Sequence, residues 1–238
     1  MRLGAMIMAS VLASSVAVDP ASPFGSVSYA LSRKEQPIEC EPGTTWHEEQ
    51  DVARYATAGE DMPGRVGWCE KPDGTRHGLM RIWWANGWLK AESTFGDGVE
   101  NGPVQTFYAD GTPQLATTHR DGKPDGRYMH WHANGQRARL MFYDNGQPHG
   151  WAQYWDEKGQ LTAQGTFVEG RKEGTWESWY ANGVLKDATR YEDGRLHGRQ
   201  LVFAEGGVFY AGSCWDRGEQ RWQTRSEIEA RTRACRPY

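Results

Sequence analysis

Glycine recurs every 24 residues through the middle of the chain, and this period limits the folds open to it. Three series of glycines share the interval, and two aromatic series run in phase with them. The glycines are Gly78, Gly102, Gly126, Gly150, Gly174 and Gly198; Gly87, Gly111, Gly135, Gly159, Gly183 and Gly207; and Gly98, Gly122, Gly146, Gly170, Gly194 and Gly218. The aromatic positions are Trp83, Phe107, Trp131, Trp155, Trp179 and Phe203, then Phe95, His119, Tyr143, Phe167, Tyr191 and Trp215, with one histidine replacing an aromatic residue. Such a period indicates stacked copies of one small unit, each burying its apolar surface against its neighbours.

Each copy has the pattern of a β-hairpin. In the fifth copy, residues 174–180 form one expected strand, Ala181-Asn182-Gly183 the turn and residues 184–191 the returning strand, before Asp193-Gly194 turns the chain again. Asn-Gly and Asp-Gly supply the positive φ that two-residue hairpin turns need. Because tight turns join about twelve such strands, only consecutive strands can pair. The sequence therefore predicts an all-β protein: an elongated, single-layer antiparallel meander of β-hairpins with a 24-residue period, followed by a short C-terminal capping helix.

A two-residue Asn-Gly turn also fixes the register of each hairpin. It places Gly174 opposite Tyr191 and, in the first copy, Gly78 opposite Phe95. An aromatic ring over a cross-strand glycine shields the backbone that the glycine leaves bare. We therefore expect the second aromatic series to cover the first glycine series.

The N-terminal residues have the composition of an export signal. Residues 1–17 hold one Arg followed by apolar and small residues, with Ser15 and Ala17 at the −3 and −1 positions of a cleavage site. A membrane anchor is the alternative, but the uncharged stretch is shorter than the roughly 20 residues that span a bilayer. We predict a signal peptide at 1–17, a flexible leader at 18–39, an N-terminal cap at 40–63, the repeat array at 64–222 and a C-terminal cap at 223–238. The expected location is periplasmic or extracellular.

The four cysteines agree with an oxidising compartment. They lie at Cys40, Cys69, Cys214 and Cys235, and four cysteines permit three pairings, or four free thiols as the alternative. About twelve strand spacings, roughly 55 Å, separate the two ends of the array. Because a disulfide spans only a few ångströms, we predict Cys40 with Cys69 and Cys214 with Cys235. Each would hold a terminal segment over a free edge of the sheet.

The residues before Cys235 predict the C-terminal helix. Ser226-Glu227-Ile228-Glu229 matches a capping box, in which the first and last side chains bond to each other's backbone N–H groups. The helix is expected to run to about Ala234.

The repeated pattern resembles a known family. Residues 174–198 and 78–102 each show a Gly, an aromatic pair, Asn-Gly, a further aromatic residue, Asp-Gly and a closing Gly. This is similar to the MORN variant repeat of bacterial YwqK-type proteins, which are named as antitoxins, and the similarity covers about residues 64–222. It implies stacked β-hairpins that contact proteins or membranes rather than catalyse a reaction.

We expect no enzyme, cofactor or metal site. His77, His149 and His197 occupy one column, but adjacent copies advance about 10 Å, so the closest pair lies about 20 Å apart. His130 and His132 lie two residues apart on one strand, with no Cys or carboxylate cluster at ligand spacing. No nucleophile elbow, zinc-binding helix motif or phosphate-binding loop is present in the sequence. A glycan-cleaving enzyme is the least favoured alternative.

The remaining surface favours a binding function. The two aromatic series and further aromatic residues exceed what one thin layer can bury, so some should contact a partner. The further residues are Trp84, Trp88, Tyr108, Trp151, Trp176 and Tyr180. The candidate aromatic face is Trp83, Phe107, Trp131, Trp155, Trp179 and Phe203, with a purely structural role as the alternative. A net charge of −4 without a basic run excludes nucleic acid as a partner and disfavours anionic lipid. We predict an exported, non-enzymatic module or scaffold that binds a protein, in an immunity or antitoxin-like role, or alternatively a lipid headgroup or cell-wall glycan.

Overall fold

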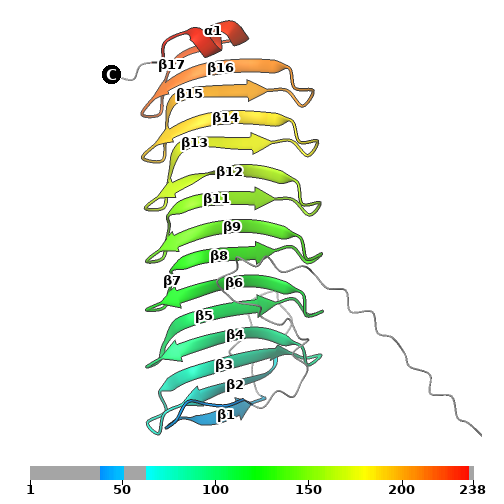
Figure 1. Cartoon of the computed structure of the whole chain (residues 1–238), viewed down its shortest axis with the longest axis vertical. Coiled ribbons are helices and arrows are strands. Elements are labelled where there is room, and N and C mark those ends of the chain that lie inside the picture. Colours follow the sequence, from blue (N-terminus) through cyan, green and yellow to red (C-terminus); the bar gives the residue numbers. More distant parts are fainter. Residues whose placement is uncertain (1–37, 51–62, 236–238) are drawn as a thin grey trace, which may run out of the picture. The chain divides into compact units, whose positions relative to one another are not determined.

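The computed structural model describes residues 38–50 and 63–235; the predicted signal peptide and most of the leader lie outside this range. The described residues form one open antiparallel sheet of 17 strands and one short helix (Figure 1), which confirms the predicted fold class. The strands are β1 (Thr45–Glu49), β2 (Pro63–Glu70), β3 (Arg76–Trp84), β4 (Leu89–Gly96), β5 (Val99–Phe107), β6 (Pro113–Arg120), β7 (Lys123–Pro124), β8 (Gly126–Trp131), β9 (Arg137–Asp144), β10 (Gln147–Pro148), β11 (Gly150–Trp155), β12 (Leu161–Val168), β13 (Arg171–Trp179), β14 (Leu185–Glu192), β15 (Arg195–Phe203), β16 (Phe209–Asp216) and β17 (Glu219–Thr224); the helix is α1 (Glu227–Thr232).

Consecutive strands pair throughout, as a meander requires. The two-residue strands β7 and β10 are the first parts of β8 and β11, from which a break at Asp125 and His149 separates them. In the other copies the equivalent strand is continuous, as in β5 and β13. The predicted hairpin register holds in all six copies. The pairs are Gly78–Phe95, Gly102–His119, Gly126–Tyr143, Gly150–Phe167, Gly174–Tyr191 and Gly198–Trp215.

The turns at one edge of the sheet are the predicted two-residue loops. Asp193 and Gly194 have φ values of 51° and 78°, and the flanking Glu192 and Arg195 are paired. The N–H of Gly194 also donates to the carbonyl of Lys172 in the preceding strand pair, at 2.9 Å. The equivalent glycine makes this bond in every copy. This edge, which we call the Asp-Gly edge, thus ties each hairpin to the one before it.

The turns at the opposite edge, the Asn-Gly edge, consist of the three residues predicted for the turn, as in Ala181-Asn182-Gly183, and not of the two-residue loop assumed for the register. Gly183 has a positive φ of 82°, but Asn182 does not. The Gly183 N–H donates to the Tyr180 carbonyl and the Tyr180 N–H to the Val184 carbonyl, each at 2.9 Å, which closes a three-residue loop with glycine in the left-handed region. A bulge at Lys186 then restores the pairing, because Ser178 faces Asp187 whereas Trp179 faces Leu185. The predicted register was correct because the longer loop and the bulge compensate.

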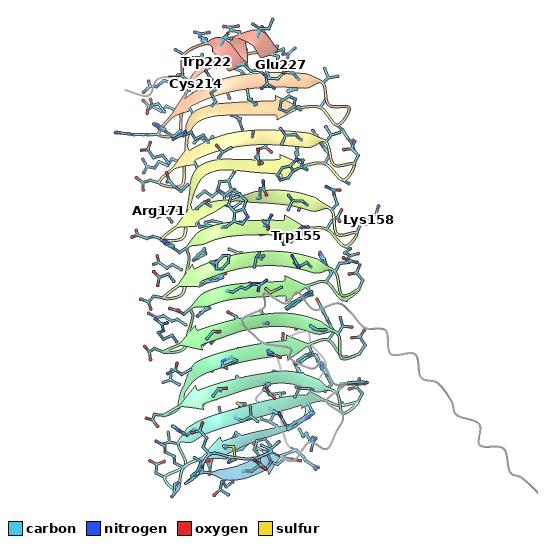
Figure 2. The ribbon with its side chains drawn as sticks, in the orientation of Figure 1. Trp155, Lys158, Arg171, Cys214, Trp222 and Glu227 are labelled. Carbon is cyan, nitrogen blue, oxygen red and sulfur yellow. A yellow bond between two sulfur atoms is a disulfide. The ribbon has the colours of Figure 1, made fainter. Side chains whose placement is uncertain are left out.

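The asparagine side chain links neighbouring loops at this edge. In the fifth copy, the Asn182 Oδ1 accepts from the Val184 N–H at 3.0 Å, while the Nδ2 donates to the Glu205 carbonyl in the next loop at 2.9 Å. Asn86 and Asn134 make the same pair of bonds. Figure 2 shows Lys158 in a loop at this edge and Arg171 at the Asp-Gly edge. The Asp-Gly edge is therefore hydrogen-bonded from each copy to the next, and at the Asn-Gly edge asparagine links the first copy to the second, the third to the fourth and the fifth to the sixth.

The first glycine series owes its position to backbone conformation rather than to a covering ring. All six glycines have a positive φ, from 69° at Gly174 to 126° at Gly102. They lie in bulges, since Glu173 and Glu177 face Thr166 and Gln164 and leave extra residues on β13. Apart from the glycine and its two chain neighbours, no described residue has a heavy atom within 4 Å of a Cβ built at Gly174 or Gly126. The paired rings therefore do not shield these glycines, and this part of the prediction was wrong.

Two caps hold the ends of the sheet, and both predicted disulfides are present. Cys40 is bonded to Cys69 on β2, next to β1, and Cys214 on β16 is bonded to Cys235 beyond α1. Figure 2 places Cys214 and Trp222 beside the helix.

The helix begins as predicted but ends earlier. It stops at Thr232 rather than near Ala234. The Ser226 Oγ accepts from the Glu229 N–H at 3.2 Å, but the Glu229 carboxylate binds the Thr224 hydroxyl, which itself takes the Ser226 N–H. The reciprocal bond of the predicted capping box is thus replaced by one through Thr224.

Candidate binding faces

The predicted aromatic face lies along the Asn-Gly edge. Trp83 is only 5% exposed, because Trp46 packs edge-on against it at 6.3 Å and the Arg65 guanidinium lies 4.0 Å above its ring. The other five residues of the series are half-buried.

The backbone of this series carries a hydrogen-bonded ladder. The carbonyls of Phe107, Trp131 and Phe203 accept bonds from the side chains of Trp84, Tyr108 and Tyr180, and that of Trp155 lies 2.9 Å from the His132 Nε2. The edge is thus a structural seam, and Trp83 itself offers little surface to a partner.

The second aromatic series faces a different surface, which we call the tyrosine face. Strand alternation places on it Tyr128, Met141, Tyr143, Ala152, Tyr154, Phe167, Trp176 and Tyr191, which form one packed cluster across β8 to β14. Trp176 is 6% exposed and lies over Gly165, with the Phe167 ring 4.8 Å away. A smaller cluster of Val66, Trp68, Met80, Ile82 and Phe95 occupies the same face at the N-terminal end. This face contains the main apolar core.

Charged groups of both signs lie among these rings. The Arg139 guanidinium is exposed and lies 5.4 Å from the Tyr154 ring, and the Lys172 ammonium lies 4.4 Å from the Trp176 ring. Asp187 accepts the hydroxyls of Ser178 and Thr189. Burial raises the pKa of the Tyr154 hydroxyl. Burial lowers the pKa of His130, and the charges of Arg139 and His132 lower it further.

One row of the tyrosine face changes in chemistry from copy to copy. Its members are Ile82, Thr106, His130, Tyr154, Ser178 and Val202 on one strand of each hairpin, and their neighbours Ala91, Leu115, Arg139, Ala163, Asp187 and Ala211 on the other. Glycine, turn and aromatic positions repeat, whereas this row does not. The fold therefore fixes a framework and leaves this row free to vary.

The opposite surface, which we call the amide face, carries a row of directly paired residues. From β5 to β13 the row is Gln105, Ala116, Met129, Leu140, Gln153, Gln164 and Glu177. Beside it lie Phe142 and Trp151, which are 39% and 42% exposed. Sequence reasoning counted Trp151 among surplus aromatic residues but missed Phe142 and the glutamines.

The histidines do not converge. The Nδ1 of His77 lies 3.0 Å from Asp97, that of His119 lies 2.8 Å from Glu100, and the Nε2 of His197 lies 3.0 Å from Glu192. His149 lies in the break between β10 and β11, and His132 lies beyond the end of β8, bound to the Trp155 carbonyl. Over residues 38–50 and 63–235, no group of three or more His, Cys, Asp or Glu side chains could hold a metal ion. Each paired imidazole instead fixes a neighbouring strand or turn.

Comparisons with known proteins bear on this array of hairpins. Residues 76–97 and 172–194 match the family model described as the MORN repeat variant, in the first and fifth copies. No curated protein matched the sequence. Among solved structures, one described as "Crystal Structure of TarM" is 15% identical with a TM-score of 0.27; the match covers 40% of this chain and 19% of that one. The chain thus spans about a fifth of that structure's length, and the similarity is too low to support an argument.

Proposed function

We propose that the chain is a non-enzymatic, exported repeat protein that binds another protein through the variable row of the tyrosine face. The observation that carries the proposal is the contrast between constant and variable positions on this face. Hydrogen bonds at the two edges of the sheet link the hairpins and hold the row in a fixed geometry. A surface that is already ordered loses little conformational entropy when it binds. The MORN repeat match supports a repeat-containing binding module.

The chemistry of the row suits a protein partner. It combines a cation at Arg139, an anion at Asp187 and the ring of Tyr154 across four strand spacings, about 20 Å, and protein interfaces mix such groups around aromatic anchors. A lipid headgroup surface would favour an excess of cations, whereas the chain has a net charge of −4. The narrower form of the proposal is an immunity or antitoxin-like role, in which the partner is an exported toxin.

Export is supported by the two disulfides, because such bonds persist in oxidising compartments. In the part of the chain that the structure describes, no helix has the length and apolar character needed to cross a membrane.

Two arginines on β9 provide a matched test. Arg139 and Arg137 are both exposed and both lie beside a ring, at 5.4 Å from Tyr154 and 5.7 Å from Trp155, but only Arg139 lies in the variable row. The oxidised chain is used to capture proteins from a cell-envelope extract, and the captured protein is then purified and titrated. We expect saturable binding that Arg139→Glu weakens at least about tenfold and Arg137→Glu leaves within about twofold. The absence of a saturable partner, or equal effects of both variants, would count against the proposal.

A further inference from the structure

The amide face carries a chain of hydrogen bonds between side chains, and the carboxylate at one end of the chain fixes which group donates in each bond. The Gln153 Nε2 donates to the Gln164 Oε1 at 3.3 Å, and the Gln164 Nε2 donates to the Glu177 Oε2 at 2.9 Å. A carboxylate can only accept, so Gln164 must present its amide nitrogen to Glu177 and its oxygen to Gln153. Gln153 must then donate as well. The three side chains are thus oriented across β11, β12 and β13.

Each amide keeps hydrogen-bonding capacity for a ligand. A side-chain amide has two N–H donors, and one on each glutamine is used within the chain. Among the described residues, nothing donates to the Gln153 Oε1. The face therefore presents preoriented donors and an acceptor, side by side and about one strand spacing apart, roughly 4.8 Å.

Two exposed rings lie next to these amides. Leu140 on β9 faces Gln153 on β11. Phe142 lies two residues from Leu140 and Trp151 two from Gln153, so strand alternation brings both rings to the amide face. The Phe142 Cβ lies 3.5 Å from a Cβ built at Gly150, the residue before Trp151, which places the two rings on adjacent strands. Thr166 pairs with Trp151 and adds a hydroxyl beside it.

The surrounding residues add few charges, which are of both signs, and one further exposed apolar side chain. The two rows that hold these rings and glutamines contain one cation, Arg127 opposite Phe142, and two anions, Glu173 opposite Thr166 and Glu177 opposite Gln164. Met129 is 7% exposed, so the exposed apolar area comes mainly from Phe142, Trp151 and Val168, of which Val168 is 37% exposed. A protein interface core needs a broader apolar patch, since a stable one buries about 800 Å² on each partner.

We propose that the amide face between β9 and β13 binds a neutral polysaccharide of β-linked sugars. Such sugars present one face of C–H groups, which packs on the negative face of an aromatic ring, and hydroxyls at the rim, which bind amides. Trp151 supplies the central ring, Phe142 extends the platform, and Gln153 and Gln164 bind the hydroxyls. Because the charges of these rows are few and of both signs, the surface favours neither a polyanion nor a polycation, and it suits an uncharged polymer. This activity is independent of the protein-binding one, since it uses the other face of the sheet.

The test measures adsorption of the oxidised full-length chain to insoluble cellulose and chitin, and calorimetric titration with cellohexaose and chitohexaose. Wild type should bind at least one of the two polymers and its soluble fragment. Trp151→Ala should weaken binding at least about tenfold, which is the scale of one stacked ring, and Gln153→Ala should weaken it severalfold. Tyr210→Ala removes an aromatic residue that is 58% exposed on β16, away from the amide chain, and should change affinity less than about twofold.

Circular dichroism and thermal melting check that each variant is folded, and the exposure of Trp151 makes a folding defect an unimportant risk. Failure to bind either polymer overturns the proposal, as does binding that Trp151→Ala and Gln153→Ala both leave intact. A protein ligand lost on Trp151→Ala, with no polysaccharide bound by wild type, would assign the face to a protein instead. None of these results bears on the Arg139 test, which probes the tyrosine face.

Discussion

Replacing Gly165 with alanine tests how closely the tyrosine face is packed. A Cβ at this position would lie 2.2 Å from the Cδ2 and 2.3 Å from the Cε2 of Trp176, far inside van der Waals contact. The indole is held in place: its Nε1 donates to the Thr166 carbonyl at 3.0 Å and the Phe167 ring packs edge-on against it. The ring or the backbone must therefore move, and overpacking of this kind costs about 1–3 kcal/mol.

Gly206→Ala is the matched control. Gly206 lies in a loop, its φ is not positive, and apart from its two chain neighbours no described residue has a heavy atom within 4 Å of a Cβ built on it. Here alanine lowers the entropy of the unfolded chain without strain, so stability should rise by about 0.4–1 kcal/mol. Equilibrium unfolding in guanidinium chloride, followed by far-UV circular dichroism with both disulfides intact, measures the two effects.

A double-mutant cycle identifies the cause. Trp176→Ala alone should cost about 3–5 kcal/mol, as for other buried large rings. In that background the clash is absent, so adding Gly165→Ala should cost less than about 0.5 kcal/mol. The reasoning is refuted if Gly165→Ala leaves the stability of the wild type unchanged, or if it costs the same with and without the Trp176 ring.

Three further predictions concern the edges and the C-terminal cap. Cys235→Ser should destabilise by about 3 kcal/mol and speed amide exchange in α1, measured by hydrogen exchange, because the Cys214 link closes a segment with a sequence separation of 21; unchanged exchange would contradict this. Asn182→Asp keeps the acceptor within its loop but removes the donor to Glu205, so it should cost about 1 kcal/mol in chemical unfolding, and Asn182→Ala more. The hydrogen bond from Arg221 lowers the pKa of the Asp216 carboxyl below its ordinary value of 3.8. The ionised carboxylate therefore stabilises the folded protein above pH 3.8, and this stabilisation is lost as the pH falls through the lower pKa of the folded state. Asp216→Asn should flatten the acid side of a plot of unfolding free energy against pH.

The register could be predicted because the repeat supplies six copies of the same evidence. The rule that places Gly174 opposite Tyr191 also places Gln153 opposite Gln164, as the structure has it. The loop at the Asn-Gly edge could not be predicted from the dipeptide alone. In a three-residue loop only the glycine needs a positive φ, and the asparagine contributes side-chain hydrogen bonds. The dipeptide Asn-Gly is therefore compatible with both the two-residue and the three-residue loop.

The hydrogen-bonded chain of Gln153, Gln164 and Glu177 could be predicted only in part from the sequence. The bond from Gln164 to Glu177 joins two hairpins, and their register depends on the bulge around Gly174, where the pairing shifts between Gln164 and Thr166. A bulge inserts extra residues into one strand, and the turn dipeptides of the sequence do not indicate how many residues are inserted. The exposure of Trp151 depends on the same geometry, since most strands carry aromatic residues and only packing decides which of them remain in contact with solvent.

The columns that hold Gln153 and Gln164 explain why the proposed polysaccharide site should occur once along the sheet. In the first copy the same two columns hold Arg81 and Glu92, which form an ion pair of 2.6 Å across the same register. The fold therefore requires only that the two side chains suit each other, and it accepts either an ionic or an amide pair. What differs is the remaining chemistry: a closed ion pair satisfies its own charges, whereas two amides retain donors and acceptors. Of the first and fourth copies, only the fourth combines amides with free hydrogen-bonding capacity and the exposed ring of Trp151. Removal of the Trp151 ring should therefore abolish glycan binding rather than move it to the first copy.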